Sequence, residues 1–208
     1  MRVWAKIIKI GKLIPIILAV LFLTSCSGIV PETGFDNQSS NPLGGILPEN
    51  ENNSRSASVY LDVPFQKYGG VNWCLPASTA MTLNFFGLQI TQSELAKTII
   101  KPDGLGDINK TVRLAKELGF KASFTTLTME QIEEYLSKQI PLIAIQKYKQ
   151  SDPLAHARVV IGYDAEKKEI FTNDPTLGEH YTVSYEQFNN LNLTANSEYC
   201  MAIVITPA

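Results

Sequence analysis

"GGVNWCLPASTAMTLNFFG" (residues 69–87) joins a glycine-rich approach to an apolar repeat. The apolar residues at helical spacing are Ala77, Ala80, Met81 and Phe85. With Gly87 as a stop, they predict a helix over residues 74–86. Pro76 fits the first turn, where its missing N–H has no partner to lose. Cys74 therefore stands at the helix start, as a nucleophile, half of a disulfide or a small apolar residue.

Helical patterns continue after this stretch, and strand patterns dominate the rest of the chain. Further helices are predicted over residues 91–100, 107–118 and 129–139. β-Branched and aromatic residues predict strands over residues 59–64, 121–127, 141–148, 156–164, 168–174, 180–184 and 198–206. This order predicts an α+β fold with N-terminal helices packed on a C-terminal, mostly antiparallel sheet.

The N-terminus has the charge and length pattern of an export signal. Four basic residues precede the apolar run Leu13–Leu23, which is shorter than the roughly 20 residues of a membrane-spanning helix. "LTSC" (Leu23–Cys26) resembles the lipobox of bacterial lipoproteins. That resemblance implies cleavage after residue 25, acylation of Cys26 with chains such as palmitate, and an extracytoplasmic protein anchored to a bacterial membrane. An ordinary signal peptide or an uncleaved anchor are the alternatives.

Composition divides the rest of the chain. Residues 26–57 hold the lipidated cysteine and a segment rich in Ser, Asn, Gly, Pro and Glu, which predicts a flexible linker. Residues 58–208 are of ordinary one-domain size. With 18 basic and 20 acidic residues, the chain has no excess of positive charge for nucleic acid.

Four residues of this domain carry the chemistry that a cysteine nucleophile needs. A helix start favours the thiolate of Cys74. His156, one of two histidines in the chain, opens a predicted strand and can act as the base. Asp174 ends the next strand, so a hairpin brings it beside the histidine as an acceptor. Gln66, which precedes the cysteine, can donate to an oxyanion together with the Cys74 N–H.

The motifs around these residues resemble a known family. They are "VPFQ" (63–66), "WCLPAS" (73–78), "HARVVIGYD" (156–164) and "NDP" (173–175). In this order they resemble the bacteriocin-processing, double-glycine-leader cysteine peptidases and, more broadly, papain-like peptidases, over residues 60–205. The resemblance implies a papain-like fold with Cys74 as nucleophile, His156 as general base, Asp174 as its orienting partner and Gln66 as oxyanion donor.

The chain also departs from that family. Leu75 follows the nucleophile where the family usually has Gly, and it is expected to crowd the oxyanion site. Ala155 and Ala157 flank the histidine where the family usually has Gly and a larger apolar residue. No transporter is attached, so the leader-peptide substrate of the family does not carry over.

Several interpretations remain open at this point. Cys74 and Cys200 are the pair left after lipidation and can form a disulfide in an exported protein. The functional classes are a thiol hydrolase acting on a peptide or on cell-envelope material, an acyl transferase of transglutaminase type, and an inactive binding module. Two histidines and no CxxC or HxxxH spacing leave too few ligands for a metal site, and no cofactor is predicted.

Overall fold

The structure is a computed structural model, and it describes residues 57–208. The strands are β1 (Ser58–Tyr60), β2 (Phe120–Leu127), β3 (Leu142–Lys147), β4 (Ala155–Asp164), β5 (Glu169–Asp174), β6 (Gly178–Ser184) and β7 (Cys200–Pro207). The helices are α1 (Cys74–Phe85), α2 (Gln92–Ile99), α3 (Ile108–Glu117), α4 (Met129–Ser137) and α5 (Tyr185–Asn190). The predicted signal peptide, the predicted lipidation site Cys26 and nearly all of the predicted linker lie outside the described residues.

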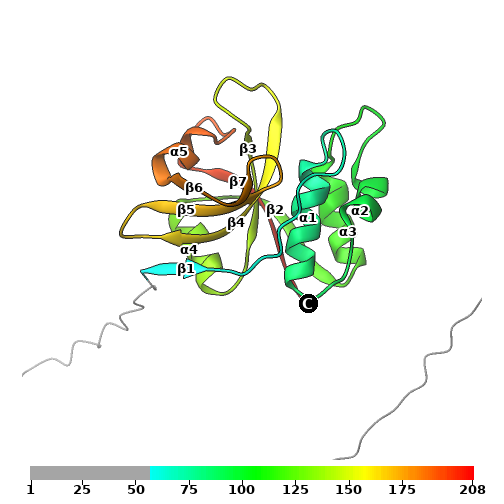
Figure 1. Ribbon diagram of the computed structural model, residues 1–208, viewed down its shortest axis with the longest axis horizontal. Helices are drawn as coiled ribbons and strands as arrows, with labels where there is room; N and C mark the ends of the chain where they lie inside the picture. Colours follow the sequence, from blue (N-terminus) through cyan, green and yellow to red (C-terminus); the bar gives the residue numbers. More distant parts are fainter. Residues whose placement is uncertain (1–56) are drawn as a thin grey trace, which may run out of the picture. The chain divides into compact units, whose positions relative to one another are not determined.

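The strands form one seven-stranded sheet with the order β2-β7-β3-β4-β5-β6 (Figure 1). Strand β1 pairs with the second half of β4, on the edge that β3 leaves open. Every strand pairing within residues 57–208 is antiparallel. The α+β class predicted from the sequence is therefore confirmed.

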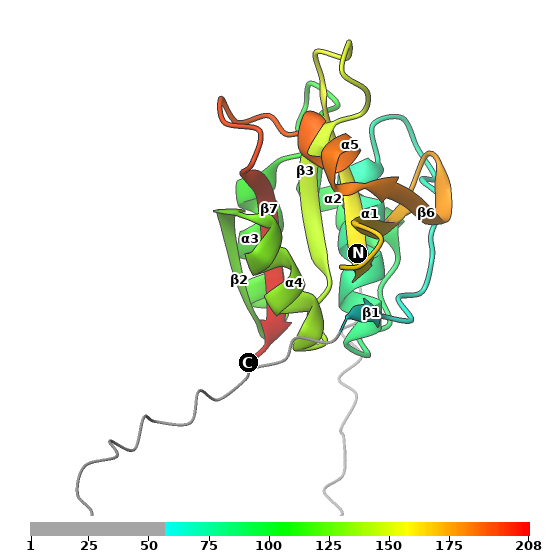
Figure 2. The ribbon, with the colours of Figure 1, turned by 90° about the vertical axis from the view of Figure 1, so that its left-hand side faces the viewer.

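Helices cover both faces of the sheet. Alternate residues of β3 enter different cores: Ile143 and Ile145 pack with α1, α2 and α3, whereas Leu142 and Ala144 pack with α4 and α5. Figure 2 shows α4 and α5 on the face opposite to α1 and α2. Because side chains leave a strand on both sides, the sheet needs cover on both faces.

Helix starts were predicted well because capping chemistry is local. Both expected capping boxes are present, Thr91 with Glu94 and Thr128 with Gln131. Helix α5 was missed, although Ser184 and Gln187 form the same type of capping box. No helix within residues 57–208 is both long and apolar enough to cross a lipid bilayer.

Candidate active site

Cys74 is the first residue of α1, at a helix N-terminus without a side-chain cap. The N-cap residue, Trp73, provides no side-chain acceptor, and the first turn contains no acidic residue. The preceding loop requires special backbone positions: Asn72 has a φ of 59°, and a Cβ at Gly70 would lie 2.5 Å from the Trp73 ring. The loop therefore delivers the half-buried Cys74 thiol to the end of α1, where helix N–H groups stabilise negative charge.

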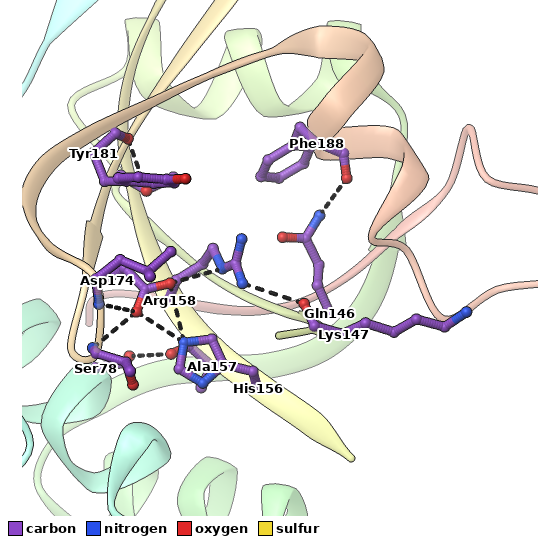
Figure 3. Close-up of polar contacts among 12 residues, drawn as sticks. Ser78, Gln146, Lys147, His156, Ala157, Arg158, Asp174, Tyr181 and Phe188 are labelled. Atoms are coloured by element: carbon purple, nitrogen blue, oxygen red, sulfur yellow. Dashed lines mark hydrogen bonds and ion pairs between the residues drawn. The ribbon is translucent and has the colours of Figure 1, made fainter. Parts of the chain in front are cut away.

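His156 and Asp174 come from the β4–β5 hairpin. The two strands pair antiparallel as a hairpin, which the sequence predicted, and Val159 lies opposite Asn173. The Nε2 of His156 lies 2.9 Å from Oδ1 and 3.0 Å from Oδ2 of Asp174 (Figure 3). This contact occupies Nε2 and leaves the Nδ1 of His156 for the cysteine, which lines the same cleft.

The Asp174 carboxylate is fully buried and its acceptor capacity is used. Its Oδ1 accepts hydrogen bonds from the backbone N–H groups of Thr176 (2.8 Å) and Leu177 (3.1 Å). Its Oδ2 lies 3.3 Å from the Nε of Arg158, which is also buried. Arg158 had no role predicted from the sequence, although it stands two residues after His156 and therefore on the same side of the strand. A signal was available, because that side of the strand carries His156.

The charges of this group favour an ion pair between Cys74 and His156. Burial raises the pKa of the Cys74 thiol, but the hydrogen bond and charge of His156 outweigh burial and lower the pKa. Burial lowers the pKa of His156, but its hydrogen bonds to Asp174 and Cys74 outweigh burial and raise the pKa. A lowered thiol pKa and a raised imidazole pKa both shift the pair from thiol and imidazole towards thiolate and imidazolium.

The second cysteine of the domain takes no part in this group. Cys200 opens β7 and is buried in the core under α4 and α5. Cys74 and Cys200 are both free thiols, so the structure does not contain the alternative disulfide. Burial raises the pKa of Cys200 to about 12, which keeps that thiol protonated.

The side chain of Leu75 was expected to point into the site, but it does not. Its side chain is buried in the core formed by α1, α2 and α3. A Cβ at Gly106 would lie 2.9 Å from the Leu75 Cδ2, so the leucine packs directly against this glycine. The first turn of the helix directs this side chain away from the thiol, and only the Leu75 N–H faces Cys74. The expected crowding is therefore wrong.

The side chain of Gln66 is hydrogen-bonded to Gln92 and not to the other three predicted residues. It is half-buried on the segment between β1 and α1, and its Oε1 accepts a hydrogen bond from the Gln92 Nε2 (3.4 Å). This contact does not use the Nε2 of Gln66, the atom that an oxyanion donor needs. The structure thus brings Cys74, His156 and Asp174 into one group, because His156 contacts Asp174 and shares a cleft with Cys74, whereas the side-chain hydrogen bond of Gln66 is to Gln92.

A cleft of about 490 Å³ opens on the thiol and the imidazole. Cys74 and His156 line it, together with the large side chains of Trp73, Leu105, Tyr148 and Leu154. The ring of Tyr148 meets the His156 ring edge to face, with centroids 5.3 Å apart. Among residues 57–208, no three His, Cys, Asp or Glu side chains gather in a way that could hold a metal ion.

Solved structures share this fold. A C39-like peptidase from Bacillus anthracis matches with a TM-score of 0.59 and 22% identity, over 73% of this chain and 98% of its own. A double glycine motif protease from an AMS/PCAT transporter, solved with its leader peptide, matches with 0.57 and 18%, over 72% and 95%. The peptidase domain of the Streptococcus transporter ComA matches with 0.55 and 20%, over 70% and 99%.

These likenesses establish the fold, and the family comes from the sequence itself. None of the curated proteins matches the chain. The model of the Peptidase_C39 like family matches residues 60–199, which is most of the chain and includes Cys74, His156 and Asp174. The chain therefore belongs to the Peptidase_C39 like family.

Proposed function

We propose that this protein is a cysteine peptidase that uses Cys74 as nucleophile, His156 as general acid and base, and Asp174 as the orienting carboxylate. One observation carries the proposal. A half-buried thiol at an uncapped helix N-terminus shares a cleft with a histidine that lowers its pKa, and the Nε2 of that histidine lies 2.9 Å from a buried carboxylate. This is the arrangement that activates a thiol for covalent catalysis.

In the first half of the reaction, the Cys74 thiolate attacks the carbonyl carbon of a peptide bond. The carbonyl π electrons move to oxygen, and the oxyanion is stabilised by the N–H groups at the start of α1. The His156 imidazolium then protonates the leaving nitrogen as the C–N bond breaks. The amine product leaves, and a thioester to Cys74 remains.

Water completes the cycle. The neutral His156 takes a proton from water as the oxygen attacks the thioester carbonyl. The C–S bond then breaks, which releases the carboxylic acid and restores the thiolate and imidazolium. Asp174 accepts from Nε2 throughout and keeps Nδ1 directed at the sulfur.

Gln66 is proposed as a second donor to the oxyanion, and Gln92 supports its placement. The Oε1 of Gln92 accepts from the Gly69 N–H (2.7 Å), and its Nε2 donates to the Lys67 carbonyl (2.8 Å) as well as to Gln66. These contacts hold the segment before the nucleophile and leave the Gln66 Nε2 free to donate.

The proposed substrate is a peptide with apolar side chains next to the scissile bond. Large apolar residues stand exposed around the cleft, among them Val71 (82% exposed) and Leu154 (54% exposed). Exposed apolar groups gathered at a cleft mark a binding surface. A structural neighbour was solved with a leader peptide, which also supports a peptide substrate.

The lipoprotein prediction remains part of the proposal, with Cys26 lipidated and the domain anchored to a bacterial membrane outside the cytoplasm. Detergent phase partition and labelling with a palmitate analogue test it. The wild-type protein should enter the detergent phase and carry the label, and Cys26→Ser should do neither. Cys200→Ser is the matched control and should behave as wild type. Label retained in Cys26→Ser would contradict the prediction.

Activity is tested with the purified full chain and a peptide library read by mass spectrometry. Wild-type protein should cleave a subset enriched in apolar residues, and Cys74→Ala should cleave none. Cys200→Ala, the other free cysteine of the domain, should cleave the same subset as wild type. Products that incorporate an added amine instead of water would show that the protein is an acyl transferase and not a hydrolase.

A further inference from the structure

Arg158 is a buried cation beneath the proposed catalytic group. It lies on β4 two residues after His156, so both side chains leave the same side of the strand. Its exposed fraction is 1%, against 7% for His156 and 0% for Asp174. Arginine is almost never fully buried without a partner, because removing its charge from water is costly.

The contacts of Arg158 identify that partner. Its Nε lies 3.3 Å from Oδ2 of Asp174, and its Nη2 donates to the Lys147 carbonyl (3.2 Å). The other titratable groups near the guanidinium are Cys200 on β7, Tyr181 on β6 and Tyr148 after β3. Asp174 is the only carboxylate among these neighbours.

Sheet register explains why the three charged groups form a row. The β4–β5 ladder pairs Val159 with Asn173. Because the strands are antiparallel, the residue before Val159 lies beside the residue after Asn173, and these two residues are Arg158 and Asp174. The Asp174 carboxylate therefore lies between two cations or potential cations, with His156 on one side and Arg158 on the other (Figure 3).

The reaction changes the charge on only one side of that carboxylate. His156 is an imidazolium before the leaving group departs and a neutral imidazole afterwards. During the neutral stage, a buried carboxylate without a second counter-ion would favour taking up a proton. Arg158 keeps its charge through the whole cycle because a guanidinium does not deprotonate in proteins.

We propose that Arg158 is a positioning residue whose buried guanidinium is the permanent counter-ion of Asp174, keeping that carboxylate ionised and turned toward His156 throughout the reaction. This inference rests on the proposed function for its catalytic meaning. The proposed effect of Arg158 on the charge of Asp174 concerns the resting protein, so it can be measured without a substrate.

The proposal fixes the sign of one measurable change. When the His156–Asp174 pair loses its proton, a buried negative charge remains, and Arg158 stabilises that state. Without Arg158 the deprotonated state is less stable, so the pKa of the pair rises, whichever residue holds the proton. A purely structural arginine would alter stability and leave this pKa in place.

Histidine NMR tests this directly because the full chain contains only His156 and His180. We expect Arg158→Gln to raise the pKa of His156 by about one unit or more, and Arg158→Lys to produce a smaller rise. Arg113→Gln, which removes an exposed charge on α3, is the matched control and should leave His156 unchanged. His180 serves as the internal reference. An unchanged or lowered His156 pKa in a folded Arg158→Gln protein would overturn the proposal.

Two further readouts keep the proposal testable. In the wild-type protein, ¹³C NMR of the Asp174 carboxyl should show it ionised while His156 passes from imidazolium to imidazole; protonation of Asp174 at that step would overturn the proposal even if Arg158→Gln does not fold. If peptides are cleaved, Arg158→Gln should lower kcat at least about tenfold with Arg158→Lys intermediate. If Arg158→Gln raises the pKa of His156 but the wild-type protein cleaves no peptide, the result would support the proposed role of Arg158 as the counter-ion of Asp174. It would reject only the peptidase function.

Discussion

The two cysteines of the folded domain have opposite surroundings. Cys74 starts a helix and lines a cleft together with His156, which lowers its pKa. Cys200 starts a strand and is buried in the core under α4 and α5. Burial acts on both thiols in the same direction, yet the pKa of Cys74 is lowered and that of Cys200 is raised to about 12.

Hydrogen-bond donors account for the difference. The thiolate of Cys74 is stabilised by His156 and by the N–H groups of Leu75 and Ala157. Cys200 has only the more distant charge of Arg158 to favour its thiolate, and its S–H donates to a backbone carbonyl. The hydrogen-bond donors directed at a cysteine therefore make it reactive, and the depth of burial alone does not determine the pKa of its thiol.

The largest expected effect comes from exchanging the thiols for alanine one at a time. Cys74→Ala should lower kcat/KM by about 10⁴-fold or more, because it removes the nucleophile. Cys200→Ala should leave kcat/KM near wild type and lower the free energy of unfolding by about 1 kcal/mol. Steady-state kinetics and denaturant unfolding measure both. Equal losses of activity in the two variants would break the contrast.

Alkylation gives the next largest contrast and needs no substrate. At pH 7, a thiol with a pKa of about 12 is ionised at least about 10³-fold less often than one below 9.0. The thiolate of the more acidic thiol is less nucleophilic, which makes the rate difference smaller than this factor, whereas the burial of Cys200 makes it larger. Iodoacetamide with peptide mass mapping should show Cys74 modified at least about 100-fold faster. Similar rates would show that the donors do not activate Cys74.

The orienting carboxylate has a smaller expected effect. Asp174→Asn should lower kcat/KM by roughly 10- to 100-fold, because the histidine loses both its tautomer control and its ionic partner. The pKa of His156 should fall, since the Asp174 carboxylate contributes to raising it. Activity should therefore decline at a lower pH on the alkaline side of the profile. Asp62→Asn, on the exposed segment after β1, is the control and should match wild type.

Leu75 should affect stability and hardly affect chemistry. Leu75→Ala leaves a cavity against Gly106 in the core, so the free energy of unfolding should fall by about 2–5 kcal/mol. Leu154→Ala, at an exposed apolar residue, should leave stability unchanged. Calorimetry measures both. A marked gain of activity in Leu75→Gly would show instead that the leucine obstructs the site.

Local chemistry explains how far the sequence predicted the fold. Capping residues and alternating strands located four of the helices and most of the sheet, because those patterns act within a few residues. Strand β1 is shorter than expected and ends at Tyr60, yet Leu61 and Val63 beyond it are buried. An apolar run alone does not distinguish a paired strand from an extended segment that only packs. The placement of helices on both faces depends on contacts between distant segments.

The same distinction applies to the site. The hairpin that joins His156 to Asp174 followed from two adjacent strands, so sequence reasoning could place both residues together. The orientation of Leu75 depends on Gly106, which is distant in the sequence, and the burial of Arg158 depends on tertiary packing, although its partner Asp174 lies on the adjacent strand. An arginine on a strand is usually exposed, and only its tertiary partner shows that this one is buried.

The pH dependence of Cys74 alkylation, compared between wild type and His156→Ala, tests the central claim most directly. The account predicts that wild-type Cys74 reacts at pH values well below those at which an ordinary thiol ionises, because His156 stabilises the thiolate. In His156→Ala the reaction should follow a single ionisation at a higher pH. Superimposable profiles for the two proteins would contradict the account, since Cys74 would then owe nothing to His156.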